Sequence, residues 1–416
     1  MAMALSVFLT AAALCGCDGA GGGSGSTGKV SGKEPLTIWT ATDIHYLSPT
    51  LADNGELFKK VMLDGDAKLT EHAPEIVDEF FEEVISAKPD ALVITGDLTF
   101  NGEIVSLREL AEKLREVQDA GIPVLVIPGN HDIDSYRAYS YSGSEVEYTE
   151  NISKEEFREI CRDFGISEAL SAADDSFSYV YAVSDDTWIM TIDANTQGAG
   201  RVTDETLKWA EEQLKKAQKN GITVITATHQ SVLAQNKRMV FGYIISNHEE
   251  VEDLLRNYGV KLNLSGHVHM QHTAAEYADG SEAETGGENA VMGEDGVLTD
   301  IATGSMTVAA LRYGIVELDE NRDFTYTMAS VNTMREEAEE RFKNRTHKQV
   351  AEALENISAA PEEKAKMAEF AEDINYKFFT GVLPEDYFEE HGEGIELWRK
   401  YGKDTFWLNY IESMQE

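Results

Sequence analysis

Residues 124–132 read Val-Leu-Val-Ile-Pro-Gly-Asn-His-Asp: a short apolar run is followed at once by an amide, an imidazole and a carboxylate. An apolar run rich in β-branched residues and bounded by turn residues is typical of a buried strand. Six more runs of this kind lie at 36–39, 91–94, 188–192, 222–225, 260–264 and 315–318. The seven runs therefore predict a buried sheet structure that extends over most of the chain.

The segments between these runs predict helices. Residues 76–84 and 107–117 carry apolar side chains at helical spacing. A third helix is expected over 204–220, because Thr203 can cap its first turn and Gly221 can end it. Strands that alternate with helices predict a layered α/β domain.

The chain divides into two folded parts after a non-globular start. We expect a catalytic domain over 34–330 and a small helical region over 331–416, where no strand-like runs occur. Residues 275–296 are expected to form a surface loop. Residues 136–149, which contain four tyrosines, either line a substrate pocket or form an ordinary surface loop.

Side chains suited to metal binding follow five of the apolar runs. They are Asp43 and His45, then Asp97, then Asn130 with His131 and Asp132, then His229, and finally His267 with His269. Ligands of α/β sheets bind at the carboxyl ends of strands, so these side chains should converge on one site. Carboxylate, imidazole and amide ligands without thiolate suit Mn, Fe, Zn or Co.

The alternative, non-functional interpretation is that these residues only cap strand ends. It explains the Asn, the Asp residues and the glycines at Gly96, Gly129 and Gly266, which let the backbone turn sharply. It does not explain the repeated histidines. Asp-x-His and His-x-His also place both side chains on one side of an extended segment, where both reach one ion.

In their order, Asp-x-His, Gly-Asp, Gly-Asn-His-Asp, His and Gly-His-x-His, these motifs resemble the calcineurin-like metallophosphoesterase superfamily. The resemblance spans residues 36–270, with strand pieces up to 318. It implies an α/β (α+β) fold, a four-layer double β-sandwich flanked by helices, to which this chain adds its helical C-terminal region. It also implies a hydrolase that cleaves phosphate esters with two transition-metal ions.

The resemblance assigns a role to each residue. Asp43, His45 and His269 would bind one ion, Asn130, His229 and His267 would bind the other, and Asp97 would bridge the two. A hydroxide shared by the ions would attack phosphorus directly. His131 would face the phosphate and protonate the departing alkoxide.

One motif departs from the protein-phosphatase branch of this superfamily. There the Gly-Asp pair continues to an Asp-Arg pair that orients the catalytic His, whereas here the chain reads Leu-Thr-Phe-Asn-Gly over 98–102. Because the side chain of Phe100 cannot hydrogen-bond an imidazole, we expect that support for His131 to be absent. We expect Asp132 to cap its turn. The pattern is closer to the phosphodiesterase and sphingomyelinase-like branches.

The charge balance limits the partners. Against 35 Lys and Arg stand 75 Asp and Glu, a formal net charge of -40. Such a surface repels polyanions, so a nucleic-acid polymer is not expected and a small phosphate ester is. The oligomeric state is left open.

The N-terminus predicts export. An apolar stretch over 4–14 leads to Leu-Cys-Gly-Cys, which resembles a bacterial lipobox and implies lipid attachment at Cys17 after removal of the preceding signal peptide. No Lys or Arg precedes the stretch, so an uncleaved anchor or a stray apolar terminus is the alternative. Residues 18–33, mostly Gly and Ser, predict a flexible tether. We expect a lipid-anchored protein outside the cytoplasm of a bacterium, with Cys161 as a buried thiol.

Three functions are compatible with these patterns. The leading one is hydrolysis of phosphodiesters, and a phosphomonoesterase or nucleotidase with the same metal centre is the first alternative. The second alternative, from another class, is a solute-binding lipoprotein. The clustered Asp, His and Asn residues argue against it, since capture of a solute does not require two metals.

Overall fold

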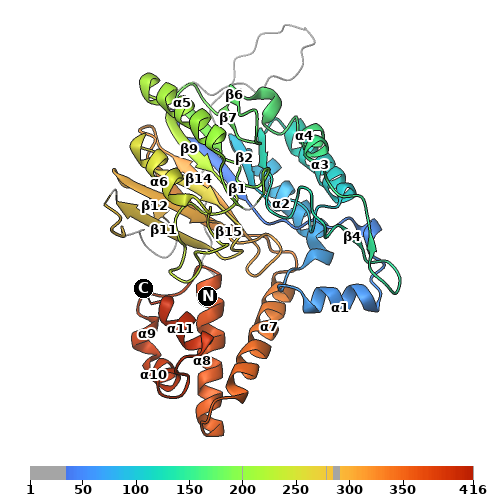
Figure 1. The fold of residues 1–416 in the computed structure, drawn as a ribbon, viewed down its shortest axis with the longest axis vertical. Coiled ribbons are helices and arrows are strands. Elements are labelled where there is room, and N and C mark those ends of the chain that lie inside the picture. Colours follow the sequence, from blue (N-terminus) through green and yellow to red (C-terminus); the bar gives the residue numbers. More distant parts are fainter. Residues whose placement is uncertain (1–33, 199, 278, 284–290, 416) are drawn as a thin grey trace, which may run out of the picture.

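The computed structural model describes residues 34–198, 200–277, 279–283 and 291–415. Cys17, the signal peptide and the tether over 18–33 lie outside these residues. Two large sheets form the centre of the catalytic domain, helices cover both, and the C-terminal helices project from one end (Figure 1).

The first sheet has six strands in the order β12-β15-β14-β1-β2-β3. Their bounds are β1 (Leu36–Ala41), β2 (Ala91–Thr95), β3 (Val124–Ile127), β12 (Val291–Met292), β14 (Arg312–Leu318) and β15 (Phe324–Ser330). β1, β2 and β3 run parallel, and β14 pairs antiparallel with β1. The carboxyl ends of the three parallel strands therefore lie at one edge.

The second sheet has seven strands in the order β11-β13-β10-β9-β8-β7-β6. Their bounds are β6 (Ser171–Ala172), β7 (Tyr179–Ala182), β8 (Thr187–Thr191), β9 (Thr223–Ala227), β10 (Leu262–Ser265), β11 (His272–Tyr277) and β13 (Val297–Ala302). β8, β9, β10 and β13 run parallel. Two short strands, β4 (Tyr139–Ser140) and β5 (Glu147–Tyr148), pair separately within the tyrosine-rich loop.

Apolar side chains fill the space between the sheets and the space outside each. Alternate residues of a strand face opposite sides, so Ile38 packs between the sheets while Trp39 packs against helices. The first sheet is covered by α2 (Ala73–Ala87), α3 (Ile104–Asp119) and α4 (Lys154–Ile160), and the second by α5 (Asp204–Asn220) and α6 (His248–Asn257) (Figure 1). The four-layer double sandwich is confirmed. All seven apolar runs lie on strands.

The third predicted helix begins and ends where the sequence predicted. Thr203 accepts a hydrogen bond from the backbone N–H of Thr206, and Gly221 adopts a left-handed conformation at the end of α5. Cys161 is fully buried beside Phe157 and Phe164, in agreement with a structural thiol.

Strand β13 was missed because Asp300 interrupts its apolar pattern. Its carboxylate is fully buried and accepts hydrogen bonds from the backbone of Leu233 and the side chains of Asn263 and Ser265. These hydrogen bonds allow a charged group to be buried inside the sheet. In the sequence, the charged residue interrupts the apolar pattern, so the strand was not predicted. The predicted surface loop over 275–296 was also partly wrong, since β11 extends into it and β12 lies within it.

Helices alone follow the last strand. They are α7 (Arg335–Glu355), α8 (Pro361–Phe379), α9 (Tyr387–Glu390), α10 (Gly392–Tyr401) and α11 (Phe406–Ser413). Trp398, Ile374 and Ile411 are fully buried among them, and this core continues onto Val268 and Met270 beside the metal-binding motifs. The predicted helical C-terminal region is confirmed. Among the described residues, no helix has the length and apolar character needed to cross a membrane.

Candidate metal centre

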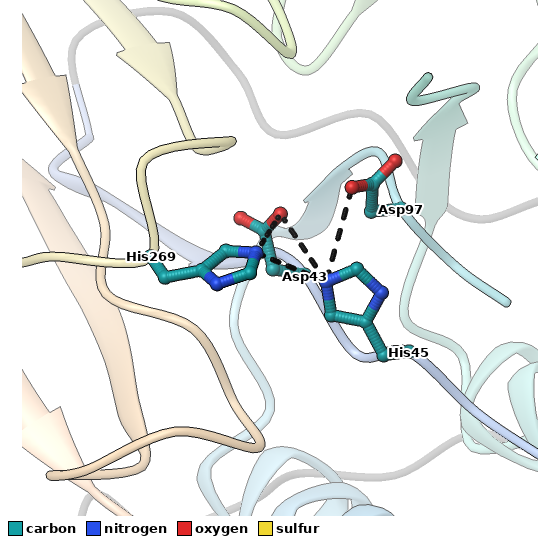
Figure 2. A group of neighbouring side chains, drawn as sticks. All are labelled: Asp43, His45, Asp97 and His269. Carbon is teal, nitrogen blue, oxygen red and sulfur yellow. Dashed lines mark hydrogen bonds and ion pairs between the residues drawn. The ribbon is translucent and has the colours of Figure 1, made fainter. Parts of the chain in front are cut away.

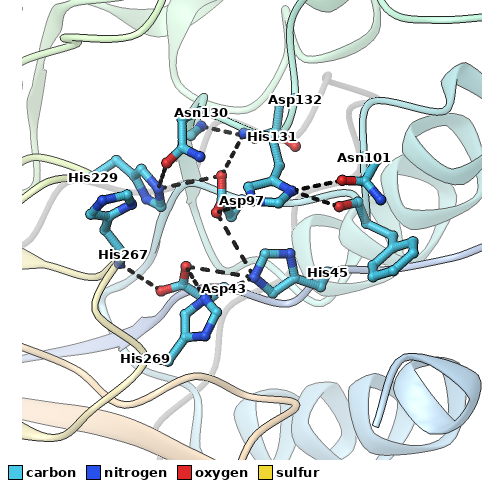
Figure 3. Close-up of polar contacts among 12 residues, drawn as sticks. Asp43, His45, Asp97, Asn101, Asn130, His131, Asp132, His229, His267 and His269 are labelled. Atoms are coloured by element: carbon cyan, nitrogen blue, oxygen red, sulfur yellow. Dashed lines mark hydrogen bonds and ion pairs between the residues drawn. The ribbon is translucent and has the colours of Figure 1, made fainter. Parts of the chain in front are cut away.

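The predicted ligands lie just beyond the ends of parallel strands from both sheets. Asp43 and Asp97 lie two residues after β1 and β2, and Asn130 lies three after β3. His229 and His267 lie two residues after β9 and β10. Figure 3 shows these side chains together with His45, His131 and His269 in one cluster. All eight predicted site residues of the described chain therefore meet in one place.

One group of ligand atoms comprises Asp43, His45, Asp97 and His269, whose atoms all lie within 4.8 Å of one another (Figure 2). Nε2 of His45 lies 3.0 Å from Nε2 of His269. It also lies 3.8 Å from a carboxylate oxygen of Asp43 and 3.8 Å from one of Asp97. Two imidazole nitrogens and two carboxylates thus point at a common volume.

A second group comprises Asp97, His229 and His267, again within 4.8 Å. Nε2 of His229 lies 3.3 Å from Oδ1 of Asp97 and 3.1 Å from Oδ1 of Asn130. Asp97 belongs to both groups, so its two oxygens can serve two ions.

The donor set fits metal ions better than it fits a network of its own. Oδ1 of Asp43 is buried and has no hydrogen-bond partner among the described residues. Such an orphaned buried oxygen costs free energy unless a ligand satisfies it. Its Oδ2, in contrast, accepts hydrogen bonds from Thr42 and from the backbone N–H of His267. The carboxylate is therefore fixed in place with one oxygen left for an ion.

Backbone carbonyls set the tautomers of two histidines. Nδ1 of His229 lies 2.7 Å from the Thr95 carbonyl, and Nε2 of His267 lies 2.9 Å from the Gly242 carbonyl. In a neutral imidazole, a ring nitrogen that donates to a carbonyl leaves the other nitrogen unprotonated and able to bind a metal. His229 therefore offers Nε2 and His267 offers Nδ1.

The backbone at the site is held in an unusual conformation. Five candidate ligands have positive φ angles: Asp43, His45, Asp97, His267 and His269, at 50°, 47°, 48°, 68° and 60°. Left-handed backbone is unfavourable for side chains other than glycine and occurs preferentially at functional sites. The surrounding loops therefore hold these residues in place against their local preference.

Two of the motif glycines are needed for close approach. A Cβ on Gly129 would lie 2.1 Å from Oδ1 of Asp97, and one on Gly266 would lie 1.9 Å from Oγ1 of Thr42. Gly96 has a positive φ angle of 92°, and glycine at this position lets the backbone turn sharply. Close approach is therefore a reason for glycine at Gly129 and Gly266 that the sequence did not predict.

The charges of the cluster act on one another. Burial raises the pKa of Asp97, but the nearby imidazoles of His229, His131 and His45 outweigh it and hold the pKa well below its usual range. Burial lowers the pKa of His229, and Asp97 with Asp43 more than offsets this, raising it to about 9. The carboxylates are therefore ionised and attract cations.

His131 lies beside the cluster, with Nε2 4.0 Å from Asp97 Oδ2. Its Nδ1 lies 2.8 Å from the Phe100 carbonyl and 3.0 Å from Oδ1 of Asn101. The expectation that His131 lacks support from this segment was wrong. The side chain of Phe100 cannot bond an imidazole, but its carbonyl can, and Asn101 supplies a second acceptor. Nδ1 therefore carries a proton and Nε2 faces the cluster.

Asp132 ties two motif loops together. Its carboxylate accepts hydrogen bonds from the backbone of Gly129, Leu98 and Thr99. In the described part of the chain it forms no hydrogen bond with the His131 ring, in agreement with the predicted role as a turn cap. The tyrosine-rich loop packs nearby, with the ring of Tyr141 6.0 Å from that of Phe100.

Sequence reasoning missed Lys68, which is only 7% exposed. Its ammonium acts electrostatically on Asp97 and Asp43, and these carboxylates partly offset the lowering of its pKa by burial. After burial itself, Lys68 is also the strongest influence that lowers the pKa of His45. In the sequence, Lys68 is a lysine in an irregular segment. Such a lysine cannot be distinguished from a surface residue.

Three histidines outside the motifs lie away from the cluster. His72 pairs with Glu75 and His248 with Glu252, as expected of surface residues. His272 instead packs against Phe378 of α8, 5.3 Å between ring centres, so its expected surface position is corrected.

The structure combines a double β-sandwich with two sets of Asp and His ligand atoms that share one carboxylate. This combination is typical of a class of metal-binding α/β proteins. The chain belongs to the calcineurin-like phosphoesterase family, whose model matches residues 36–271.

Curated relatives are named as phosphodiesterases. A probable cyclic nucleotide phosphodiesterase of Rhodococcus erythropolis is 26% identical over 236 residues, 56% of this chain and 65% of that protein. A probable glycerophosphodiester phosphodiesterase of Arcobacter nitrofigilis is 28% identical over 192 residues, 45% of this chain and 60% of that protein. The matches thus span less than two thirds of either relative.

Among solved structures, this chain is similar to a dimetal phosphatase from Danio rerio. It is 12% identical, with a TM-score of 0.47, and the alignment covers 71% of this chain and 99% of that one.

Proposed function

We propose that this protein is a metal-dependent phosphodiesterase that holds two transition-metal ions, of Mn, Fe, Zn or Co. The observation that carries the proposal is the shared Asp97, which joins the two groups of ligand atoms. Asp43, His45 and His269 would complete one ion site, and Asn130, His229 and His267 the other. When bound, the ions would supply Lewis acidity and a nucleophile at neutral pH.

The chain's own residues perform the remaining work. Asn130 would offer its amide to the second ion, and the buried ammonium of Lys68 acts electrostatically on Asp97 and Asp43. His131 presents Nε2 to the cluster, and its Nδ1–H is held by the Phe100 carbonyl and Asn101. A ring anchored in this way can hold a proton at Nε2 and pass it to the departing alkoxide.

Two observations favour diesters over monoesters. The relatives from Rhodococcus erythropolis and Arcobacter nitrofigilis are both named for diester cleavage. The segment after Asp97 also lacks the Asp-Arg pair of the protein-phosphatase branch.

The test compares bis(4-nitrophenyl) phosphate with 4-nitrophenyl phosphate in added Mn, using wild type and Asp97→Asn. We expect faster diester cleavage by wild type and loss of both activity and bound metal in the variant. Asp185→Asn, an exposed position, is the matched control and should keep both. Preferred monoester cleavage would assign a phosphomonoesterase or nucleotidase. No cleavage with fewer than two ions per chain would overturn the enzyme and favour a solute-binding lipoprotein.

We also propose that Cys17 carries a lipid that anchors the protein outside the cytoplasm of a bacterium. The lipobox-like residues 14–17 and the Gly/Ser stretch over 18–33 support this. Cys17→Ala should move the protein from the membrane fraction to the soluble fraction. An unchanged distribution, or an unmodified Cys17 by mass spectrometry, would overturn the anchor.

A further inference from the structure

A cavity of about 460 Å³ lies directly beside the metal centre. His269, a candidate ligand, and Val268 form part of its wall, and helices α7, α8 and α11 form the opposite part. Its size falls in the range of small-molecule sites. A group attached to a phosphate at the metal centre could therefore enter it.

The cavity wall is rich in aromatic rings. Phe406, Trp407 and Tyr410 come from α11, Phe379 comes from α8, and Tyr243 comes from the loop before α6. Phe406 and Tyr410 are stacked, with ring centres 5.5 Å apart and planes at 20°. Phe406 is nevertheless 70% exposed and Tyr243 is 42% exposed. Exposed rings gathered around a cavity provide faces on which a flat ligand can stack.

The charged and polar wall residues are mostly paired with one another. Arg345 forms an ion pair with Asp66 at 3.0 Å, and Asn375 donates to Thr346 at 3.0 Å. Asp66 therefore does not leave an uncompensated negative charge. These two pairs are satisfied within the wall, whereas the side chains of Arg238 and Gln349 form no hydrogen bond or ion pair among the described residues.

The cavity lies on the side of the centre opposite to His131. Figure 3 shows His131 and His269 on opposite sides of the Asp97 and Asp43 carboxylates. The ring of His45 lies between them, 5.0 Å from each. If His131 protonates the departing alkoxide, the departing oxygen lies on its side and the attacking oxygen lies opposite to it. The retained ester oxygen is then equatorial, its substituent leaves the phosphorus sideways, and the cavity beside His269 is a space that this substituent can enter.

We propose that this cavity binds the retained ester group of the substrate, and that this group carries a flat aromatic ring. The substrate class is thus phosphodiesters of an aryl or nucleoside alcohol. The inference rests on the proposed phosphodiesterase function and assigns a binding role to the C-terminal helices.

The experiment keeps 4-nitrophenolate as the departing group and varies the retained group. The substrates are the methyl, hexadecyl, phenyl and thymidine-5′ esters of 4-nitrophenyl phosphate. We expect kcat/KM for the phenyl or thymidine ester to exceed that for the methyl ester by about ten-fold or more, since aromatic stacking contributes at this scale. The phenyl and thymidine arms distinguish the two sources of the ring.

The variant Phe406→Ala combined with Tyr243→Ala removes two exposed rings with little risk to folding. It should reduce the ratio of kcat/KM for the aromatic esters to kcat/KM for the methyl ester several-fold. Met292→Ala is the matched control, because Met292 is 65% exposed on β12 and outside the cavity wall. It should not change this ratio.

Equal kcat/KM for methyl and aromatic esters, a preference for hexadecyl, or a preference that survives the double variant would overturn the proposal. These outcomes leave the phosphodiesterase itself intact, since the methyl ester is still cleaved. If no diester is cleaved, the proposed function fails, and calorimetric titration decides on the cavity. Tighter binding of diphenyl than of dimethyl phosphate, lost in the double variant, supports it, and equal binding overturns it.

Discussion

Asn101 and the Phe100 carbonyl are the two acceptors that hold the His131 ring, at 3.0 and 2.8 Å from Nδ1. We treat Asn101 as a positioning residue. Asn101→Ala should lower kcat about ten-fold for diesters with an alkyl departing group, because an alkoxide needs the proton that a well-placed His131 delivers. The rate for a 4-nitrophenyl ester, whose departing anion is stable, should change little. Steady-state kinetics with both substrates provide the measurement.

Asn101→Asp retains an oxygen acceptor and should restore the alkyl ester rate. A purely structural role for Asn101 would instead lower the rates for both departing groups equally. That result would contradict the positioning of His131 by this side chain.

Glu103 introduces a pH dependence of stability close to the same segment. Its carboxylate is fully buried, accepts a hydrogen bond from the backbone N–H of Asn101 at 3.0 Å, and has a pKa raised by burial to about 7. Between pH 4.5 and 7 the unfolded chain ionises while the folded chain keeps the proton. The free energy of unfolding therefore falls as pH rises, by up to about 3 kcal/mol.

Glu103→Gln removes this ionisation, so the variant should be more stable than wild type at pH 8 and similar to it at pH 4.5. Denaturant unfolding at both pH values gives the comparison. Glu112→Gln, at an exposed position of α3, should keep the pH dependence of wild type. A stability difference for Glu103→Gln that is the same at both pH values would rule out the buried ionisation.

At the level of single residues, the sequence predicted which side chains cluster at the site but not the groups that support them. The Asp, His and Asn ligands follow apolar runs in recognisable motifs. The Phe100 carbonyl is a backbone group and has no sequence signature. Lys68 approaches the site through tertiary packing, which no local pattern encodes.

Helix α7 fixes the segment that carries Lys68. Arg341 of α7 donates to the Lys68 carbonyl at 3.1 Å and pairs with Glu71 at 2.7 Å. Arg341→Gln should lower the free energy of unfolding by about 1–3 kcal/mol, the usual range for charged hydrogen bonds of limited exposure. It should also accelerate hydrogen exchange in residues 66–72 while the central strands stay protected.

The control on the same helix is Lys343→Gln. Lys343 pairs with Glu339 within α7 and is half exposed, at 52%. Its loss should cost less than about 0.5 kcal/mol. If both variants lose equal stability, α7 contributes only its own helicity and does not hold the Lys68 segment.

The seven runs rich in Val and Ile were predicted as strands, whereas β7, β15 and the interrupted β13 were not. Six of the seven apolar runs bury most of their side chains on both faces of a sheet, and the run on β14 leaves Glu317 exposed. β13 contains Asp300, and its carboxylate is satisfied by Asn263 and Ser265 of β10 and by the backbone of Leu233 in the loop after β9. The short β4 and β5 lie in a loop whose tyrosines gave no alternation.

For the whole molecule, the net charge of -40 should slow the approach of an anionic substrate. Raising the ionic strength from 0.01 to 0.15 M shortens the Debye length from about 30 to about 8 Å. We expect kcat/KM for an anionic diester to rise about two- to five-fold over this range. kcat should stay constant, because screening acts on encounter. A fall in kcat/KM would show that local cations at the site dominate the field.

The cavity also belongs to the scale of the whole molecule, since it joins residues near 268 with helices that begin at Arg335. No sequence motif predicted the cavity, because only folding brings these segments together.

The candidate ligands and the cavity wall come from different parts of the chain, which affects how such proteins diversify. Every candidate ligand lies between Asp43 and His269, within the family-matched residues 36–271. The aromatic wall is encoded mostly after Arg335. Mutations or exchanges in the last quarter of the gene can therefore alter which ester is accepted while the catalytic apparatus is inherited unchanged. A descendant protein can thereby accept a new substrate while it keeps the original reaction.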